Sequence, residues 1–307
     1  MPENGCTIAA VIPAWNAAPW IARAIESVLA QSRPPEELIV VDDGSTDATA
    51  EIVRGFGDRV RLVSQANRGL SAARNAGIRA AGTDWIAFLD ADDYWQPGKL
   101  EAQARLLADR PELAFVSCAA RLVYEDGGEA GHWPCMSEQE ARTPLETLFR
   151  RHAAVAGSGS AVVARRDLLL AAGGFDESLR ALEDIDMWMR LAQRGGYACL
   201  PEPLVVIRRR RGSMSGDLDV MKTAARRVMA KNRGLLASDR GRFWHQCYAA
   251  MLTDYAKWEL RAGRRWQAAA TLLEAGCHAP LAQGRLVASL WLAWLRGGLP
   301  APSGGSR

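Results

Sequence analysis

Three clusters of carboxylates are the residues of this sequence best suited to chemistry, and one of them lies at residues 90–93. Asp90, Asp92 and Asp93 directly follow the apolar run Trp85–Leu89. Carboxylates at the end of a buried strand cost free energy unless a cation or hydrogen-bond donors compensate them. Mg²⁺ and Mn²⁺ take oxygen ligands, commonly carboxylates together with substrate phosphates. The cluster therefore predicts a divalent metal site, although such a sequence taken alone also fits a polar turn with a helix cap.

The second cluster is the pair Asp42 and Asp43, which follows the apolar run Glu37–Val41. A carboxylate at the end of a strand can accept hydrogen bonds from a nucleoside base or a ribose hydroxyl, as in dinucleotide-binding folds. The alternative is that the sequence DDGSTD forms only a turn and a helix cap. The local sequence leaves both interpretations open.

The third cluster comprises Glu183, Asp184 and Asp186, at the beginning of the predicted helix Glu183–Gln193. Acidic residues are common in a first helical turn because they complement the helix dipole. The functional alternative is a general base at the mouth of a cleft, positioned by the turn at Gly174. Either way, the carboxylates lie at the N-terminal end of this helix.

A basic segment begins with the four consecutive arginines of Arg208–Arg211. Residues 208–242 contain 11 Lys and Arg against three Asp. Such a stretch needs an anionic partner or open solvent. Because no nucleic-acid-binding motif accompanies it, we expect no nucleic-acid partner and favour a diphosphate or an anionic lipid surface.

The elements that must position these clusters alternate between strand and helix in the first 90 residues. This alternation predicts βαβ units and a doubly wound, mostly parallel, Rossmann-like sheet of the α/β class. Ligands of such sheets bind beyond the carboxyl ends of the strands, so the residues that follow three of the four strands should meet at one edge. The predicted strands are Thr7–Pro13, Glu37–Val41, Val60–Ser64 and Trp85–Leu89, and the helices are Ala18–Gln31, Ala48–Gly55 and Gly69–Ala81.

The second half of the chain is less regular. Apolar runs predict strands at Leu113–Ala120, Ala161–Ala164 and Leu204–Ile207, and Gly157–Ser160 is expected to be a flexible turn. From Asp217 onward the pattern is helical. We therefore expect a catalytic α/β domain at residues 1–215 and a helical C-terminal region at residues 216–307.

Composition excludes several classes of protein. Apolar residues make up 49% and charged residues 24% of the 307 residues, which is ordinary for a globular protein. The six cysteines contain no CxxC pair and there are four histidines, which argues against a structural zinc site. With no secretory signal and no run of 18 apolar residues, we expect reduced thiols and a cytoplasmic protein.

Six motifs, in order along about two thirds of the chain, resemble the family 2 glycosyltransferases, which have the GT-A fold. This resemblance implies inverting transfer from a nucleoside diphosphate sugar, a UDP-sugar being the favoured donor, to an acceptor hydroxyl, with Mg²⁺ or Mn²⁺. The motifs are VIPAWN (Val11–Asn16), VVDDGSTD (Val40–Asp47), NRGLSAARNAGI (Asn67–Ile78), FLDADD (Phe88–Asp93), GGFDE (Gly173–Glu177) and LEDIDMWMRL (Leu182–Leu191).

The resemblance also implies roles for single residues. Asp184 matches the catalytic base. The DxD element corresponds to Asp90 and Asp92, with Asp92 the preferred metal ligand and Asp93 a second candidate. The residues expected around the nucleotide are Pro13, Asn16, Asp42, Asp43 and Arg74.

One departure concerns the metal site. The family often carries a histidine after the last strand, before the dipeptide GS, and here Arg210 stands at that position within the sequence IRRRRGS. Arginine does not ligate a metal, but it pairs with a diphosphate in a bidentate manner. We therefore expect Arg208 and Arg210 to contact the diphosphate, and the strictness of metal dependence stays open.

The resemblance favours surface polysaccharide or glycoconjugate synthesis, with a glycan or lipid-linked acceptor. Two alternatives remain: a non-catalytic module that binds sugar nucleotides, and a nucleotidyltransferase. The C-terminal run Leu286–Leu295 could lie at the inner face of the plasma membrane, or could pack onto Trp258, Trp266 and Leu272 as core. The sequence predicts no oligomeric state.

Overall fold

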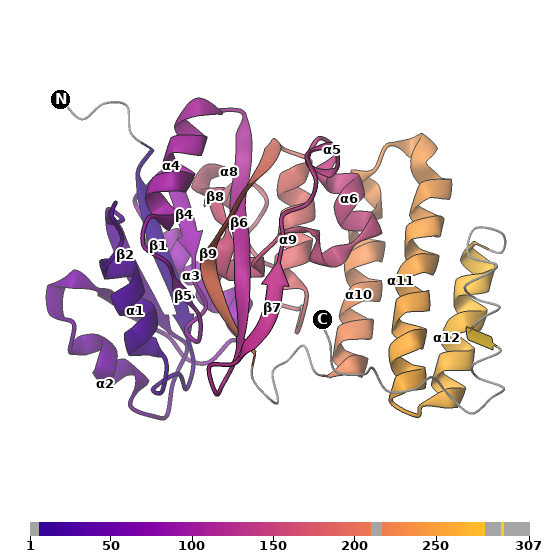
Figure 1. The fold of residues 1–307 in the computed structure, drawn as a ribbon, viewed down its shortest axis with the longest axis horizontal. Coiled ribbons are helices and arrows are strands. Elements are labelled where there is room, and N and C mark those ends of the chain that lie inside the picture. The colour runs from indigo at the N-terminus through magenta and orange to yellow at the C-terminus, as the bar shows by residue number, and fades with distance from the viewer. Residues whose placement is uncertain (1–5, 210–216, 280–289, 292–307) are drawn as a thin grey trace. The chain divides into compact units, whose positions relative to one another are not determined.

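The computed structural model describes residues 6–209, 217–279 and 290–291. The chain divides into two compact units, coloured along the chain in Figure 1. The first unit comprises Met1–Leu145 and Ala153–Arg210, and the second comprises Glu146–His152 and Arg211–Arg307.

The first unit is built on one sheet, in which the described residues form nine strands in the order β3-β2-β1-β4-β8-β6-β9-β5, with β7 paired to β6. Strands β3, β2, β1 and β4 are parallel, as are β6 and β9, whereas β5, β7 and β8 pair in antiparallel fashion. The predicted α/β class with a mostly parallel sheet is therefore confirmed. The strands are β1 (Ile8–Ala14), β2 (Glu37–Asp42), β3 (Arg61–Ser64), β4 (Trp85–Phe88), β5 (Tyr94–Trp95), β6 (Leu113–Tyr124), β7 (Glu129–Trp133), β8 (Val163–Arg165) and β9 (Gly196–Arg209).

Helices cover both faces of this sheet, which explains the continuous apolar runs of its central strands. Ile8 and Ile12 of β1 pack with Ile25 of α1 on one face. On the opposite face, α3 approaches so closely that a Cβ atom on Gly77 would lie 2.3 Å from Val11 Cγ1. The helices of this unit are α1 (Ile21–Leu29), α2 (Thr49–Arg54), α3 (Leu70–Ala80), α4 (Lys99–Asp109), α5 (Glu138–Ala141), α7 (Ser158–Ala161), α8 (Arg166–Ala171) and α9 (Glu183–Ala192). Helix α6 (Pro144–Arg150) belongs mostly to the second unit.

Two elements of the second half differ from the sequence prediction. The segment expected to be a flexible turn at Gly157–Ser160 contains the helical turn α7, which follows Gly157 at φ 71°. The last strand was expected at Leu204–Ile207 but extends over Gly196–Arg209. It is longer because it pairs in parallel along the length of β6, with register shifts that local periodicity does not reveal.

The cysteines also differ from expectation, because Cys135 and Cys199 form a disulfide whose Cα atoms are 5.8 Å apart. Cys6, Cys118, Cys247 and Cys277 are free thiols. The prediction that all thiols are reduced is therefore wrong at the two paired positions, which are 64 residues apart and come together only through the sheet. Disulfides are typical of oxidising compartments, so the thiols give no support for a cytoplasmic location.

The second unit is helical, as predicted, with α10 (Leu218–Lys231), α11 (Gly241–Arg261) and α12 (Arg265–His278). Of the run Leu286–Leu295, only Leu290 and Trp291 lie among the described residues, and both pack against Leu260 and Leu272. The expected packing partner Trp266 is instead 79% exposed. None of the described helices has the length and apolar composition to span a bilayer.

Candidate functional site

The predicted convergence of strand ends on one edge of the sheet is confirmed. Ala14 at the end of β1 pairs with Asp42 at the end of β2, and Phe88 at the end of β4 pairs with Val11. The segments that continue from β1, β2 and β4 therefore begin side by side, although the ends of the neighbouring strands β1 and β4 are separated in sequence by β2, β3 and the helices between them.

The loop after β1 is tied to the loop after β2 by Asn16. Its side-chain Oδ1 accepts a hydrogen bond from Thr46 N (2.8 Å), and its backbone N–H donates to Ser45 Oγ (3.0 Å). Pro13 is buried within β1. Sequence reasoning missed Trp15, which is 58% exposed beside Asn16. Its signal was available, because a large aromatic residue within a strand-end motif is a surface on which a planar base can stack.

Asp43 is buried and bonded within the chain. Its carboxylate accepts hydrogen bonds from the Gln65 side chain (2.7 Å) and from the backbone N–H groups of Arg68 (3.0 Å) and Gly69 (2.7 Å). Asp42 accepts one from Ser45 N (3.1 Å). The bonds to Asp43 hold residues 65–69, which directly precede α3, so Asp43 fixes the conformation of this loop.

Arg74 of α3 joins two of the three acidic clusters. Its fully buried guanidinium forms ion pairs with Asp90 Oδ1 and with Glu183 Oε1, each at 2.7 Å. Burial opposes its charge, but the neighbouring carboxylates raise the pKa of Arg74 above its usual value. Gly159 lies against this guanidinium, where a Cβ atom would be 2.7 Å from Nη2. Arg74 is therefore a charged cross-link inside the unit.

The acidic turn at residues 90–93 contains two kinds of carboxylate. Asp93 is buried, and it accepts hydrogen bonds from Ser160 Oγ (2.5 Å) and from Arg208 N (2.9 Å). Burial, followed by the charges of Asp92 and Asp90, raises the pKa of Asp93 well above its usual value. Asp90 and Asp92 are only partly buried. The two less buried carboxylates are thus the ones placed to meet a ligand.

The same turn is a fitting place for a cation. Its three carboxylates repel one another, as the raised pKa of Asp93 indicates, and Arg74 forms an ion pair with Asp90. A divalent ion bound by Asp90 and Asp92 would relieve this repulsion, with phosphate oxygens as further ligands. Among the described residues, no group of three or more His, Cys, Asp or Glu side chains has the arrangement of a complete metal site.

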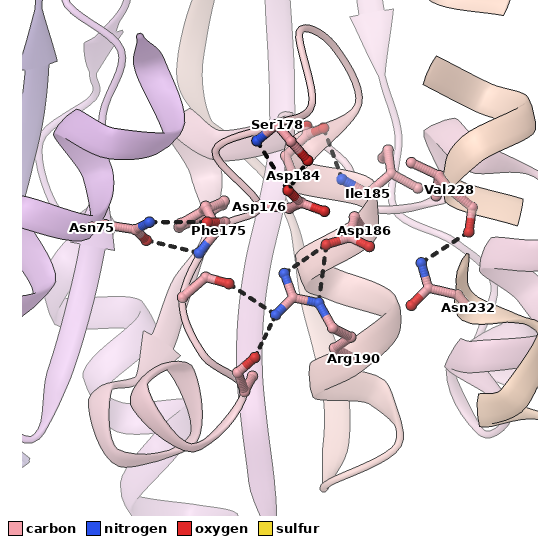
Figure 2. A network of polar contacts seen from close by, with 12 residues as sticks. Asn75, Phe175, Asp176, Ser178, Asp184, Ile185, Asp186, Arg190, Val228 and Asn232 are labelled. Carbon is pink, nitrogen blue, oxygen red and sulfur yellow. Dashed lines mark hydrogen bonds and ion pairs between the residues drawn. The ribbon is translucent and has the colours of Figure 1, made fainter. Parts of the chain in front are cut away.

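The acids of α9 have separate partners. Glu183 pairs with Arg74, and burial raises its pKa. Asp184 is 8% exposed; its Oδ2 accepts a hydrogen bond from Ser158 Oγ and its Oδ1 accepts one from Ile185 N (2.8 Å). Asp186 is fully buried and pairs with Arg190, as Figure 2 shows. Within the described part of the chain, Asp184 is therefore bonded by a hydroxyl and a backbone N–H group, whereas Glu183 and Asp186 each pair with an arginine.

The loop at Gly173–Glu177 is held by two side chains from different helices. Asn75 of α3 donates to Phe175 O (2.9 Å) and accepts from Phe175 N (2.7 Å), both drawn in Figure 2. Arg190 Nη1 donates to the carbonyl oxygens of Ala172 (2.7 Å) and Gly174 (2.8 Å). The GGFDE loop therefore connects α3 to α9. Asp186 contributes indirectly, because it pairs with Arg190, which bonds the loop.

Aromatic packing fixes α9 on the sheet. Trp188 is fully buried and stacks on Phe115 of β6, with ring centroids 5.6 Å apart. It also meets Phe175 edge to face at 5.9 Å. This packing anchors the helix whose first turn carries Asp184.

Backbone strain is concentrated in the same place. In the described residues, the non-glycine residues with positive φ are Asn16 (49°), Ser158 (47°) and Leu182 (58°). Asn16 follows β1, Ser158 contacts Asp184, and Leu182 directly precedes Glu183. Such conformations cost of order 1–3 kcal/mol each and are typical of functional sites.

The predicted diphosphate-binding arginines are described in part. Arg208, near the end of β9, lies beside the acidic turn, because its backbone N–H donates to Asp93. Its side chain is partly exposed. Arg210 lies outside the described residues.

Comparison with known sequences gives matches over the same region. The family model described as "Glycosyl transferase family 2" matches residues 9–170, just over half of the chain. The succinoglycan biosynthesis protein ExoO of Rhizobium meliloti is 38% identical over 218 residues, which are 67% of this chain and 61% of that protein. An uncharacterized glycosyltransferase of Nostoc sp. is 43% identical over 98 residues, 31% of this chain and 30% of its own length. The chain thus spans less than two thirds of the length of each of these two relatives.

Solved structures share the fold. The mannosyltransferase PcManGT of Pyrobaculum calidifontis, in complex with GDP-Man and Mn²⁺, matches with a TM-score of 0.63 at 22% identity, over 94% of this chain and 81% of that chain. TarS 1-349 of S. aureus, in complex with UDP-GlcNAc, matches with a TM-score of 0.61 at 16% identity, over 95% and 92%. These similarities confirm the GT-A fold.

Proposed function

Because this chain belongs to glycosyltransferase family 2, we propose that it transfers a sugar, with inversion, from a nucleoside diphosphate sugar to an acceptor hydroxyl. The observation that carries the proposal is the buried Arg74, which links Asp90 of the acidic turn to Glu183 beside Asp184. One network thereby holds carboxylates suited to a metal–diphosphate complex and a carboxylate suited to remove a proton. We assign this activity to residues 1–215, with residues 216–307 as a helical region.

Asp184 is the general base of this proposal. Its carboxylate accepts the proton of the acceptor hydroxyl while the hydroxyl oxygen attacks the anomeric carbon. The bond from that carbon to the diphosphate breaks on the opposite side, so a single displacement inverts the configuration. Glu183 is less suited to this task, because it is committed to Arg74.

Asp92 and Asp90 are the residues that would hold Mg²⁺ or Mn²⁺. The ion, when bound, supplies positive charge that stabilises the diphosphate leaving group. In this proposal the guanidinium groups of Arg208 and Arg210 also bond the diphosphate oxygens. Asp93 was the second candidate ligand, but both of its oxygens accept hydrogen bonds from the chain, which favours a supporting role in which it orients Asp90 and Asp92.

The nucleoside lies, in this proposal, at the loops after β1 and β2. Trp15 offers its exposed ring to the base, with Asn16 and Asp42 beside it. Pro13 and Asp43 are buried and support these loops. We favour a uracil base, and comparing the binding of UDP with that of GDP tests this choice.

Incubation with a panel of sugar nucleotides and acceptors tests the reaction. Release of free nucleoside diphosphate, and an inverted anomeric configuration of the product by NMR, are expected. Release of pyrophosphate would identify a nucleotidyltransferase. Tight donor binding without any release, across all acceptors, would identify a non-catalytic module and refute the proposal.

The acceptor is a glycan or a lipid-linked sugar, in surface polysaccharide or glycoconjugate synthesis, as the similarity to the succinoglycan biosynthesis protein suggests. We place the enzyme on the cytoplasmic side, in peripheral contact with the membrane. Trp266 (79% exposed) and Leu273 (62% exposed) lie seven residues apart on one face of α12, an arrangement suited to a lipid interface. Flotation with anionic vesicles is expected for the full chain and not for Trp266→Ala with Leu273→Ala; equal recovery of both would exclude this surface.

A further inference from the structure

One helical turn, α7, contacts both halves of the site. Ser158, its first residue, donates a hydrogen bond from Oγ to Asp184 Oδ2. Ser160, two residues later, donates to Asp93 Oδ2 (2.5 Å) and accepts from Asp90 N (3.1 Å). The separation between the acidic turn and Asp184 is therefore set through a segment of only three residues.

This turn is itself rigidly held by the interior of the unit. Ser160 and Ala161 are 1% and 0% exposed. The carbonyl oxygen of Ser160 accepts a hydrogen bond from Trp95 Nε1 (2.8 Å), and that of Ala161 accepts one from Gln103 Nε2 (2.9 Å). Because its own position is fixed, α7 can fix the groups that it contacts.

The backbone of Ser158 is strained, with φ 47°. A left-handed conformation costs a residue with a Cβ atom about 1–2 kcal/mol relative to the usual region, whereas glycine adopts it freely. A glycine at this position would relieve this strain but could not bond Asp184. Strain retained at a residue whose hydroxyl bonds a candidate base indicates that the hydroxyl has a function.

We propose that Ser158 is a positioning residue for Asp184. The hydroxyl of Ser158 and the backbone N–H of Ile185 bond opposite oxygens of the carboxylate, which fixes its plane for removal of the acceptor proton. Each carboxylate oxygen retains a further lone pair for the acceptor hydroxyl. This inference rests on the proposed role of Asp184 as the base.

The test compares Ser158→Gly with wild type by initial rates of nucleoside diphosphate release and by thermal unfolding. We expect kcat to fall by about 10-fold to 10²-fold, the loss typical of a misplaced catalytic group. The KM for the donor should stay within about twofold, because the hydroxyl of Ser158 bonds Asp184, whereas the acidic turn is bonded by Ser160, which the variant retains. The melting temperature should stay close to that of wild type, because the relieved strain at residue 158 offsets the lost hydrogen bond and the added freedom of the unfolded chain.

Ser32→Ala is the matched control, since it also deletes a serine hydroxyl that bonds a carboxylate, Glu101 Oε2 at 2.6 Å, on the exposed surface. Its kcat should equal that of wild type. In an Asp184→Asn background, Ser158→Gly should cause no further loss, because its effect passes through Asp184.

Unchanged kcat in Ser158→Gly, a fall in kcat that accompanies a lower melting temperature, or a full additional loss in the Asp184→Asn background would each overturn the role of Ser158. An absence of transfer by the wild-type chain with every donor and acceptor would instead refute the proposed function. The two failures are therefore distinguishable.

Discussion

Replacing Arg74 by methionine should separate the charge of the buried cross-link from its volume. Arg74→Met keeps a long side chain but leaves Glu183 and Asp90 without their common partner. The side chain of Glu183 is 9% exposed and that of Asp90 is 31% exposed, so the Glu183 pair should dominate the loss. Removing one partner of a buried ion pair costs about 3–5 kcal/mol, whereas a partly exposed pair contributes less than about 1 kcal/mol.

The pH dependence of this loss follows from Glu183. Burial raises its pKa in the folded state above the ordinary value of 4.5, and Arg74 opposes that rise. An acid with a raised pKa binds its proton more tightly when folded, so its contribution to stability is largest at low pH and is lost as pH rises from 4.5 through the folded-state pKa. Without Arg74 this loss should be larger. The variant should be closest to wild type near pH 5 and weakest near pH 8.

Urea unfolding at the two pH values measures the effect, and Glu183→Gln serves as the partner variant. In the double variant, Glu183→Gln should recover about 2 kcal/mol or more at pH 8, because it removes the uncompensated buried charge. A loss below about 1 kcal/mol in Arg74→Met, or one that is equal at both pH values, would show that the pair is not buried as described.

The other predictions concern the reaction. Asp92→Asn should lower the rate by about 10²-fold or more, because it removes a ligand of the ion that bears the leaving-group charge; full activity of this variant with EDTA present would exclude the metal assignment. Asp184→Asn should lower kcat by about 10²-fold to 10⁴-fold with donor binding intact by calorimetry, and an active Asp184→Asn beside an inactive Glu183→Gln would move the base to Glu183. Arg208→Ala retains the backbone bond to Asp93 and should weaken binding of nucleoside diphosphate about 10-fold while nucleoside binding is unchanged; equal diphosphate affinity would assign Arg208 to solvent or lipid.

Several strands of the first unit could be predicted from the local pattern of apolar residues. The strands Ile8–Ala14, Glu37–Asp42 and Trp85–Phe88 differ from their predicted bounds by about one residue, because apolar runs broken by turn residues report burial directly. The β6–β9 pairing could not be predicted in this way. Its register shifts, and the antiparallel insertion of β8 between β4 and β6, depend on which strands meet.

The sequence by itself determined which chemistry is present: three acidic clusters, two of them at the ends of buried strands, and a basic segment that begins at the end of the last strand. Tertiary structure decided which of these carboxylates bond other groups of the chain. Asp43 holds the segment before α3, Asp186 holds Arg190, and Asp93 holds Ser160 and β9. Ser158 gained its significance only from its position beside Asp184. The physical reason is that periodicity reports the burial of single elements, whereas pairing of charges joins residues up to about 110 positions apart, as in Arg74 and Glu183, and is set by packing.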